Sequence, residues 1–224
     1  MKRTQLKDRI LPSYTKGEEI FNMTSHIAGG AVGVAALCLC VIFSALHGDA
    51  YAVVSSAIYG ATIIILYTMS SIYHGMPKEK MAKKVFQILD HCSIFLLIAG
   101  SYTPFCLVMF REYDTALGWW LFGIIWGMAI IGIVFNSIDI KKYKKMSMLC
   151  YLVMGWCIIL KANLLPELLG TGGLILLVAG GLSYTLGAVF YAMGKKKRYI
   201  HSVFHLFVVI ASILHFFCIF FYVI

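Results

Sequence analysis

Charged residues are scarce in this sequence. Only 13% of its 224 residues are charged and 61% are hydrophobic, whereas a soluble globular domain has about 25% charged and about 45–50% apolar residues. This composition excludes a water-soluble enzyme and an intrinsically disordered protein. The seven cysteines are odd in number, scattered, and mostly within apolar runs, without any Cys-x-x-Cys spacing. A secreted domain held together by disulfides is therefore excluded as well.

Long apolar runs fill most of the chain. A helical membrane span needs roughly 17–25 mainly apolar residues, and seven stretches meet that length: 23–46, 50–74, 85–110, 117–138, 146–165, 171–194 and 200–224. The fifth is the weakest, because Lys161 and Pro166 crowd its end. The sequence therefore predicts an all-α bundle of seven transmembrane helices, forming a single membrane domain over residues 1–224. No cleavable signal peptide and no internal repeat is evident.

The basic residues fall almost entirely on one side of this predicted bundle. Of the 19 lysines and arginines, all but Arg111 and Lys161 precede the first span or lie in the second, fourth and sixth connections. Because basic loops stay in the cytoplasm, we predict a cytoplasmic amino terminus and an external carboxyl terminus. The formal charge of +9 thus reflects membrane topology, and we expect no binding to nucleic acid.

Ionisable residues gather at one predicted depth, near the cytoplasmic helix ends. His74 closes the second span, Asp90 opens the third, and His201 and His205 open the seventh. Such residues inside spans are energetically costly and indicate function. His201 and His205 are four residues apart, so they share one helix face. Two imidazoles at that spacing can both reach one Zn²⁺ at about 2.0–2.1 Å.

The remaining parts of a zinc site come from other helices. His74 is the best-placed third ligand, and three protein ligands plus a water form the open arrangement of a catalytic zinc. Asp90 could hold that water or orient a ligand. Ser70 lies one helical turn before His74 and could hydrogen-bond into the site. A His-x-x-x-His pair alone is a weak signal, and the shared depth with His74 and Asp90 is what favours a metal site over packed histidines.

A polar stripe lies where the first span begins. Glu19, Asn22 and His26 recur every three to four residues, so they occupy one face of the first helical turns. We interpret this stripe as a structural cap or clamp of the bundle, with a catalytic role as the alternative.

These motifs together resemble the hemolysin III branch of the progestin and adipoQ receptor family, which includes the adiponectin receptors and shares motifs with the alkaline ceramidases. The resemblance covers almost the whole chain and rests on an ordered set: Glu19-x-x-Asn22-x-x-x-His26-x-x-Gly29, Ser70-x-x-x-His74, Leu89-Asp90, Ala99-Gly100-Ser101-Tyr102-Thr103-Pro104, and His201-x-x-x-His205.

The resemblance implies a seven-helix bundle with an intracellular amino terminus, in the plasma membrane of a bacterium. It implies that His74, His201 and His205 bind zinc, that Asp90 contacts the zinc-bound water, and that Ser70 is the serine of the family motif. The eukaryotic relatives are similar to lipid amidohydrolases, although neither ceramide nor hormone binding transfers to this chain.

The sequence therefore leads to three functional hypotheses. The first is a zinc-dependent hydrolase of lipid amides or esters, with Asp90 as general base, Ser70 near the carbonyl oxygen, and the acyl chain of a membrane lipid between the helices. The second is a non-enzymatic regulator of membrane lipid state with a structural zinc. The third is a haemolytic or pore-forming membrane protein. The sequence does not indicate an oligomeric state.

Overall fold

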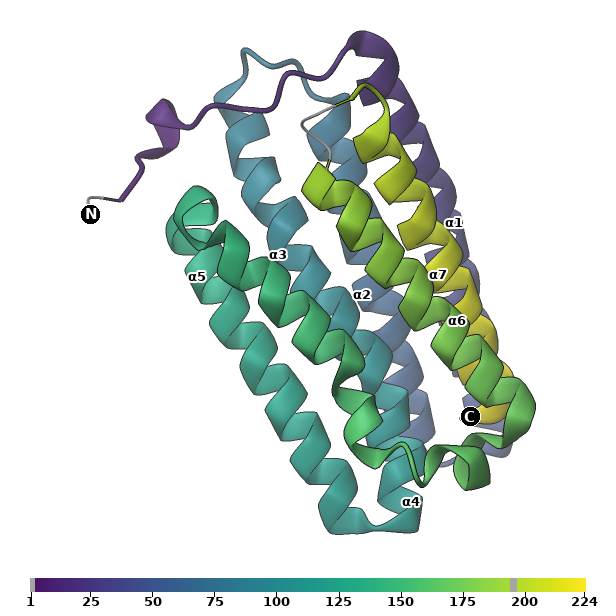
Figure 1. The fold of residues 1–224 in the computed structure, drawn as a ribbon. Coiled ribbons are helices and arrows are strands. Elements are labelled where there is room, and N and C mark those ends of the chain that lie inside the picture. The colour runs from purple at the N-terminus through teal and green to yellow at the C-terminus, as the bar shows by residue number, and fades with distance from the viewer. Residues whose placement is uncertain (1–2, 194–196) are drawn as a thin grey trace.

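The computed structural model describes residues 3–193 and 197–224, and its long elements are all α-helices. The described residues contain no β-strand, and six of the helices are long and apolar enough to cross a membrane. These are α1 (Lys16–His47), α2 (Ala50–Gly75), α3 (Met81–Pro104), α5 (Thr115–Trp156), α6 (Leu165–Met193) and α7 (Ile200–Tyr222), shown in Figure 1. The predicted all-α, polytopic membrane fold is confirmed.

Short elements complete the chain: η1 (Leu6–Asp8) precedes α1, η2 (Phe105–Phe110) and α4 (Arg111–Tyr113) follow α3, and η3 (Cys157–Lys161) follows α5. Pro104 ends α3 because it has no N–H to donate to the helical ladder. The chain continues as the fully buried π-helical stretch η2, so α3, η2 and α4 form one candidate span.

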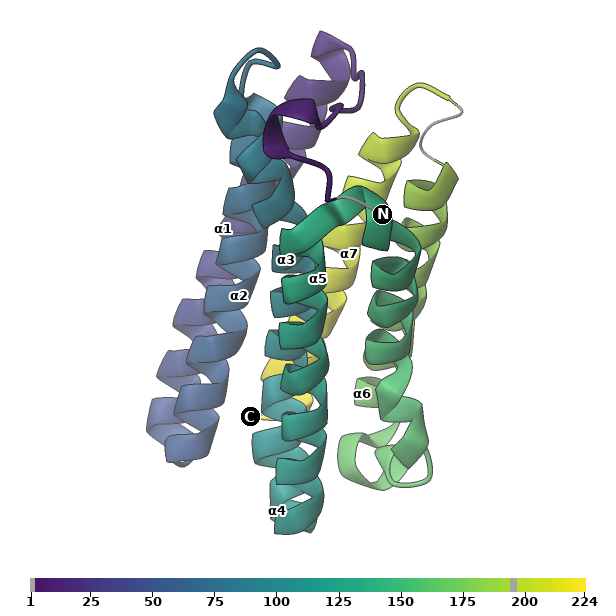
Figure 2. The same cartoon turned by 90° about the vertical axis from the view of Figure 1, so that its left-hand side faces the viewer.

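The element α5 is a helical hairpin. Asp139 within it has extended backbone angles, with φ −162° and ψ 99°, and Asn136 Nδ2 lies 3.2 Å from the Tyr151 hydroxyl oxygen, fifteen residues later. A straight helix would separate such residues by about 22 Å, so the chain reverses at Asp139, as Figure 2 shows. The Asp139 carboxylate accepts hydrogen bonds from the backbone N–H groups of Lys141 and Lys142 at 3.0 and 3.1 Å. It thereby caps the second limb of the hairpin.

This hairpin explains why the number of long helices differs from the number of predicted spans. The predicted span at 117–138, and all but the last four residues of the predicted span at 146–165, lie in the helical stretch Thr115–Lys161, which folds back at Asp139. The loop expected between them is a tight turn, because Asp139 alone breaks the helix and caps the next one. The described residues therefore contain six helices long and apolar enough to cross a membrane where the sequence suggests seven, and the two limbs of the hairpin account for the difference. Seven membrane crossings, and the orientation of the termini, stay predictions.

Several helices also begin ahead of the predicted apolar runs, and the difference is largest for α1 and α6. Helix α1 begins at Lys16, ahead of the predicted residue 23, because Thr15 and Glu18 form a capping box. Helix α6 begins at Leu165, ahead of the predicted residue 171, and bends at Gly170, whose φ of 61° favours glycine.

The helices pack in an order that places α1 between α2 and α7. Helix α1 packs on α2 and α7, α2 on α3, α3 on α5, and α6 on α7. Large side chains such as Tyr59, Tyr67 and Phe95 are fully buried between them. Helices α2 and α3 approach closely at Gly100, where a Cβ atom would overlap the side chain of Thr62. This packing brings the carboxyl end of α2 and the amino end of α7 to the same end of the bundle (Figure 1).

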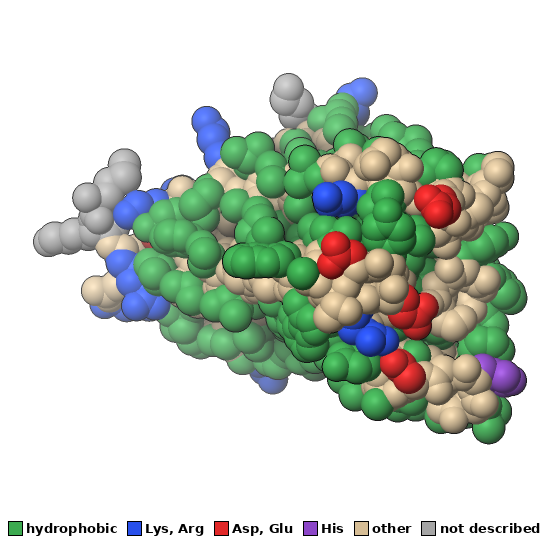
Figure 3. Space-filling view, turned by 90° about the horizontal axis from the view of Figure 1, so that it is seen from below, with side chains coloured by type: hydrophobic (Ala, Val, Ile, Leu, Met, Phe, Trp, Pro, Cys, Tyr) green, Lys and Arg blue, Asp and Glu red, His purple; other side chains and the backbone are tan. Residues whose placement is uncertain are grey.

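The two ends of the bundle carry different charges. We call the end that carries residues 3–15 and the connection between α2 and α3 the basic end (Figure 1); Lys78 and Lys84 contact residues 3–15 there. Figure 3 shows the opposite end, where acidic and basic side chains lie among apolar ones.

Candidate metal centre

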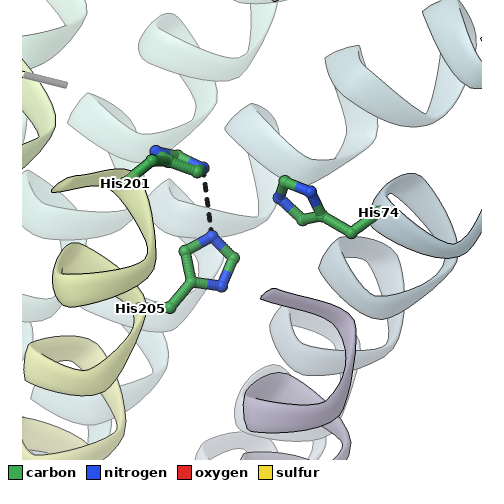
Figure 4. A group of neighbouring side chains, drawn as sticks. All are labelled: His74, His201 and His205. Atoms are coloured by element: carbon green, nitrogen blue, oxygen red, sulfur yellow. Dashed lines mark hydrogen bonds between the residues drawn. The ribbon is translucent and has the colours of Figure 1, made fainter. Parts of the chain in front are cut away.

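Three histidines from two helices meet at the basic end of the bundle. His74 lies in the last turn of α2, and His201 and His205 lie in the first two turns of α7. One ligand nitrogen from each lies within 4.8 Å of those of the others, and all three side chains are buried. We call His74, His201 and His205 the three-histidine group (Figure 4). These three residues, which were predicted to lie at one depth of the membrane, are therefore also close to one another in the structure.

The spacing within this group fits a metal ion. Nitrogens bound to a tetrahedral metal at about 2.05 Å lie about 3.3 Å from one another, and the Nε2 atoms of His201 and His205 are 3.1 Å apart. The ring centroid of His74 lies 4.9 Å from that of His205 and 5.5 Å from that of His201. The nitrogens of this pair have the separation expected of two metal ligands, and one ligand nitrogen of His74 lies within 4.8 Å of them.

Hydrogen bonding leaves one nitrogen of His74 available. Its Nδ1 lies 2.6 Å from the Glu19 carboxylate, and because a carboxylate accepts, Nδ1 carries the proton. Its Nε2 is buried without a partner among the described residues. A buried polar atom without a partner is costly, so this nitrogen is suited to a ligand that the chain itself does not supply.

Glu19 is held in turn by a buried lysine. The Lys83 ammonium donates to Glu19 Oε1 at 2.8 Å and to the Met76 carbonyl at 2.9 Å, and Lys83 is only 1% exposed. A carboxylate that fixes the orientation of a histidine is the usual outer partner of a metal ligand. Glu19 also joins α1 to α2 and α3, as expected for a clamp. Its hydrogen bond to His74 was not predicted from the sequence.

The buried position of Lys83 was not predicted either, although its spacing from Asp90 in the sequence could have indicated it. Lys83 lies seven residues, about two helical turns, before Asp90 on α3, so both residues face the same way. A lysine on the face that carries a functional aspartate is a candidate for a buried ion pair.

The other two residues of the stripe on α1 pack on the three-histidine group. Asn22 Nδ2 lies 3.5 Å from His74 Nδ1. The ring of His26 stacks on that of His205 with centroids 3.8 Å apart, and meets Tyr67 edge-on at 5.0 Å. Asn22 and His26 are both buried. This face of α1 thus forms one wall of the site.

Asp90 and Ser70 lie on a cavity that also reaches His201 and His205. Ser70 is buried and its Oγ has no partner among the described residues. Asp90 is partly buried, and its Oδ2 lies 3.6 Å from Nδ1 of the neighbouring His91. Asp90 stands outside the set of ligand atoms that lie within 4.8 Å of one another. A contact between Asp90 and a water on the metal stays a prediction.

The cavity has a volume of about 990 Å³ and extends into the bundle beyond the histidines. It reaches His215 on α7, and the fourteen residues from His201 to His215 span about 21 Å of helix. Apolar side chains line its length, among them Ile94, Ile98 and Val208. A polar site therefore opens into a long, mainly apolar space.

Tyr14 covers the site from the basic end. Its ring stacks on that of His201, with centroids 4.9 Å apart and planes inclined by 16°, and lies 5.7 Å from that of His74. Burial raises the pKa of Tyr14, and the nearby Tyr191 and Asp90 add to the effect. The phenol is therefore neutral at physiological pH. Nothing in the residue pattern before the first span indicated this contact.

Comparison with known proteins places the chain in a family. It is 43% identical over 206 residues to Hemolysin-3 of Bacillus cereus, with 92% of each chain covered. It is 38% identical over 209 residues to the Hemolysin-3 homolog of Bacillus subtilis (strain 168), covering 93% of this chain and 96% of that protein. The human monocyte to macrophage differentiation factor is 29% identical over 181 residues, covering 78% of this chain and 72% of the human protein.

The family described as Haemolysin-III related matches residues 14–216. That range includes Ser70, Asp90 and the three-histidine group, so the resemblance inferred from the ordered motifs is confirmed. With six helices able to span a membrane and close bacterial relatives, this chain is a multi-pass bacterial membrane protein that belongs to the haemolysin III-related family.

Proposed function

We propose that the protein is a zinc-dependent hydrolase that cleaves an amide or ester bond of a membrane lipid. One observation carries the proposal: in a group of three buried histidines, His201 and His205 have Nε2 atoms 3.1 Å apart and line a cavity of about 990 Å³ that is long and mainly apolar. Imidazole ligands suit zinc, and a long apolar cavity suits an acyl chain. The combination supports chemistry at the polar end of a lipid.

The residues divide the work of hydrolysis among them. His74, His201 and His205 would hold Zn²⁺, which supplies polarisation of the scissile carbonyl and lowers the pKa of water. Asp90 accepts a proton from the attacking water while the oxygen of that water bonds to the carbonyl carbon. The bond from that carbon to nitrogen or oxygen then breaks, and Asp90 returns the proton to the leaving group. Ser70 donates a hydrogen bond to the carbonyl oxygen.

A non-enzymatic regulator with a structural metal is the second candidate. The observation that favours it is the covering of the histidines, because Tyr14 stacks on His201 and His26 stacks on His205. Structural zinc sites keep no ligand position open for water. The haemolysis in the names of the relatives fits either candidate, since released lipid products or a disturbed lipid composition would both weaken a membrane.

The deciding experiment uses purified full-length protein and a panel of lipid amides and esters. Zinc content is measured first, and hydrolysis is then followed for the zinc-loaded protein, the chelated protein, and the chelated protein after zinc is restored. We expect activity only in the two zinc-containing samples. Full zinc occupancy without cleavage of any lipid would favour the structural metal, and chelator-resistant cleavage would overturn the mechanism.

A further inference from the structure

The chain before α1 crosses the basic end of the bundle as an extended strap. We call residues 3–15 the N-terminal segment (Figures 1 and 2). Its start is attached to the turn of the α5 hairpin, where Arg3 Nε donates to the Ile138 carbonyl at 3.0 Å and Thr4 N donates to Asp139 Oδ2 at 2.9 Å. Its middle is attached to α3, where Lys84 Nζ donates to the Lys7 carbonyl.

The other end of the segment is fixed beside the histidines. Lys78 Nζ donates to the Tyr14 carbonyl at 2.7 Å, and the next residue, Thr15, is locked in the capping box of α1. Glu18 accepts a hydrogen bond from the backbone N–H of Tyr199, just before α7, at 2.8 Å. The Tyr14 ring is therefore held over the start of α7, where it stacks on His201.

The N-terminal segment also forms part of the cavity wall. Thr4, Arg9, Leu11 and Tyr14 line the same cavity as His201. The segment thus separates the three-histidine group from the aqueous side at the basic end.

No side chain of this segment is fully buried. Its helical turn η1 contains no buried residue, and the Ile10 side chain is 88% exposed. The attachments that involve Arg3, Lys78 and Lys84 are exposed hydrogen bonds. Segments with few buried apolar contacts and solvent-exposed hydrogen bonds open at low cost in free energy. The segment can therefore open while the helices stay packed.

We propose that the N-terminal segment is a lid over the three-histidine group, and that Tyr14 is the residue that closes it. In the closed state the Tyr14 ring shields His201 and His74 from water. In the open state metal, water and polar product exchange with the aqueous phase. The proposal rests on the proposed metal site, and it explains how a site covered by aromatic rings serves a reaction that consumes water, as loop closure does in other enzymes.

Metal release from the zinc-loaded, full-length protein in detergent tests the lid. The protein is mixed with excess EDTA, and zinc release is followed over time in the wild type, Tyr14→Ala and Tyr14→Phe. A contact between aromatic rings corresponds to a factor of about 2 to 10 in a rate or equilibrium, and Tyr14→Ala should release zinc faster by that factor. Tyr14→Phe should match the wild type because it keeps the ring. The matched control is Tyr113→Ala, which removes an exposed tyrosine at the opposite end.

A second pair of variants opens the lid without changing the ring. Lys78→Met removes the hydrogen bond to the Tyr14 carbonyl and should also speed release, whereas Lys80→Met, two residues away, should not. This pair decides the question if Tyr14→Ala folds poorly.

The outcomes separate the lid from the metal site. Zinc bound at full occupancy and released at the wild-type rate in Tyr14→Ala and Lys78→Met would overturn the lid and leave the metal site standing. Failure of the wild type to bind zinc at all would overturn both. Faster release in Tyr14→Phe equal to that in Tyr14→Ala would also overturn the role of the stacked ring.

Discussion

The substitution Glu19→Gln tests whether the outer carboxylate prepares His74 to bind a metal. Glu19 accepts hydrogen bonds from His74 Nδ1 at 2.6 Å and from Lys83 Nζ at 2.8 Å. Glutamine has nearly the same shape, but one of its two terminal atoms is a donor. Whichever way the amide turns, either His74 or Lys83 loses its acceptor. If the amide nitrogen faces His74, the ring proton moves to Nε2, which is the nitrogen needed for the metal.

The structure gives a magnitude for this loss. A hydrogen bond to a charged group contributes about 1.5–3 kcal/mol, and here it lies beside the buried Lys83. Since about 1.4 kcal/mol is a factor of ten in a dissociation constant, most of that range is a loss of about 10- to 100-fold. Changes in the outer partners of metal-binding histidines have the same range, about 10- to 100-fold in metal affinity. We therefore expect Glu19→Gln to raise the Kd for zinc by about 10- to 100-fold.

The assay is a competition titration against a chromogenic zinc chelator, with a thermal melt of each variant alongside. The matched control is Glu18→Gln, because Glu18 is the neighbouring carboxylate but bonds to Thr15 and to Tyr199 N, not to a histidine. Glu18→Gln should lower the Tm and change the Kd for zinc far less than Glu19→Gln does. Wild-type affinity in Glu19→Gln, or an equal loss of affinity in both variants, would refute the reasoning.

Four further predictions follow from the same structure. Glu19→Ala should destabilise the protein by about 3–5 kcal/mol because it leaves Lys83 buried without its carboxylate, and a chemical melt should show part of that loss recovered when Lys83→Met is added. His205→Ala should lose zinc as measured by elemental analysis, whereas His215→Ala should keep it; equal zinc contents would remove His205 from the site. Asp90→Asn should keep zinc and lower the rate of lipid hydrolysis by about 10²–10⁴, so an unchanged rate would mean that Asp90 is not the base. A reporter fused after Ile224 should be external in whole cells, and a cytoplasmic signal would contradict the seven-span prediction.

Where the relative positions of residues depend on a single helix, the sequence could predict them. The spacing of His201 and His205 fixes them on one face of α7 whatever the neighbouring helices do. The charge pattern of the connections predicts which helix ends share an end of the bundle, and this is why His74 could be assigned to the same group before any contact was known. Both inferences need only the helical period and the order of the spans.

Residues whose role depends on a contact between elements could not be predicted. The bond from Glu19 to His74 depends on how α1 turns about its own axis against α2. The stacking of Tyr14 on His201 depends on the course of an extended segment that has no periodic pattern. The turn at Asp139 depends on one backbone conformation within a helical run, and apolar runs alone do not mark where a helix is capped.

The number of ligands is the physical feature that separates the two functional candidates. A structural zinc has four protein ligands, whereas the described residues whose ligand atoms approach one another within 4.8 Å are three histidines. Three ligands leave one position of a tetrahedron for water or substrate, and the cavity that Ser70 and Asp90 line is also lined by His201 and His205. The rings of Tyr14 and His26 cover His201 and His205 without offering the fourth ligand. A closed site of this kind suits an enzyme only if its cover opens, so the rate of metal exchange in Tyr14→Ala bears on the function of the protein as well as on the lid.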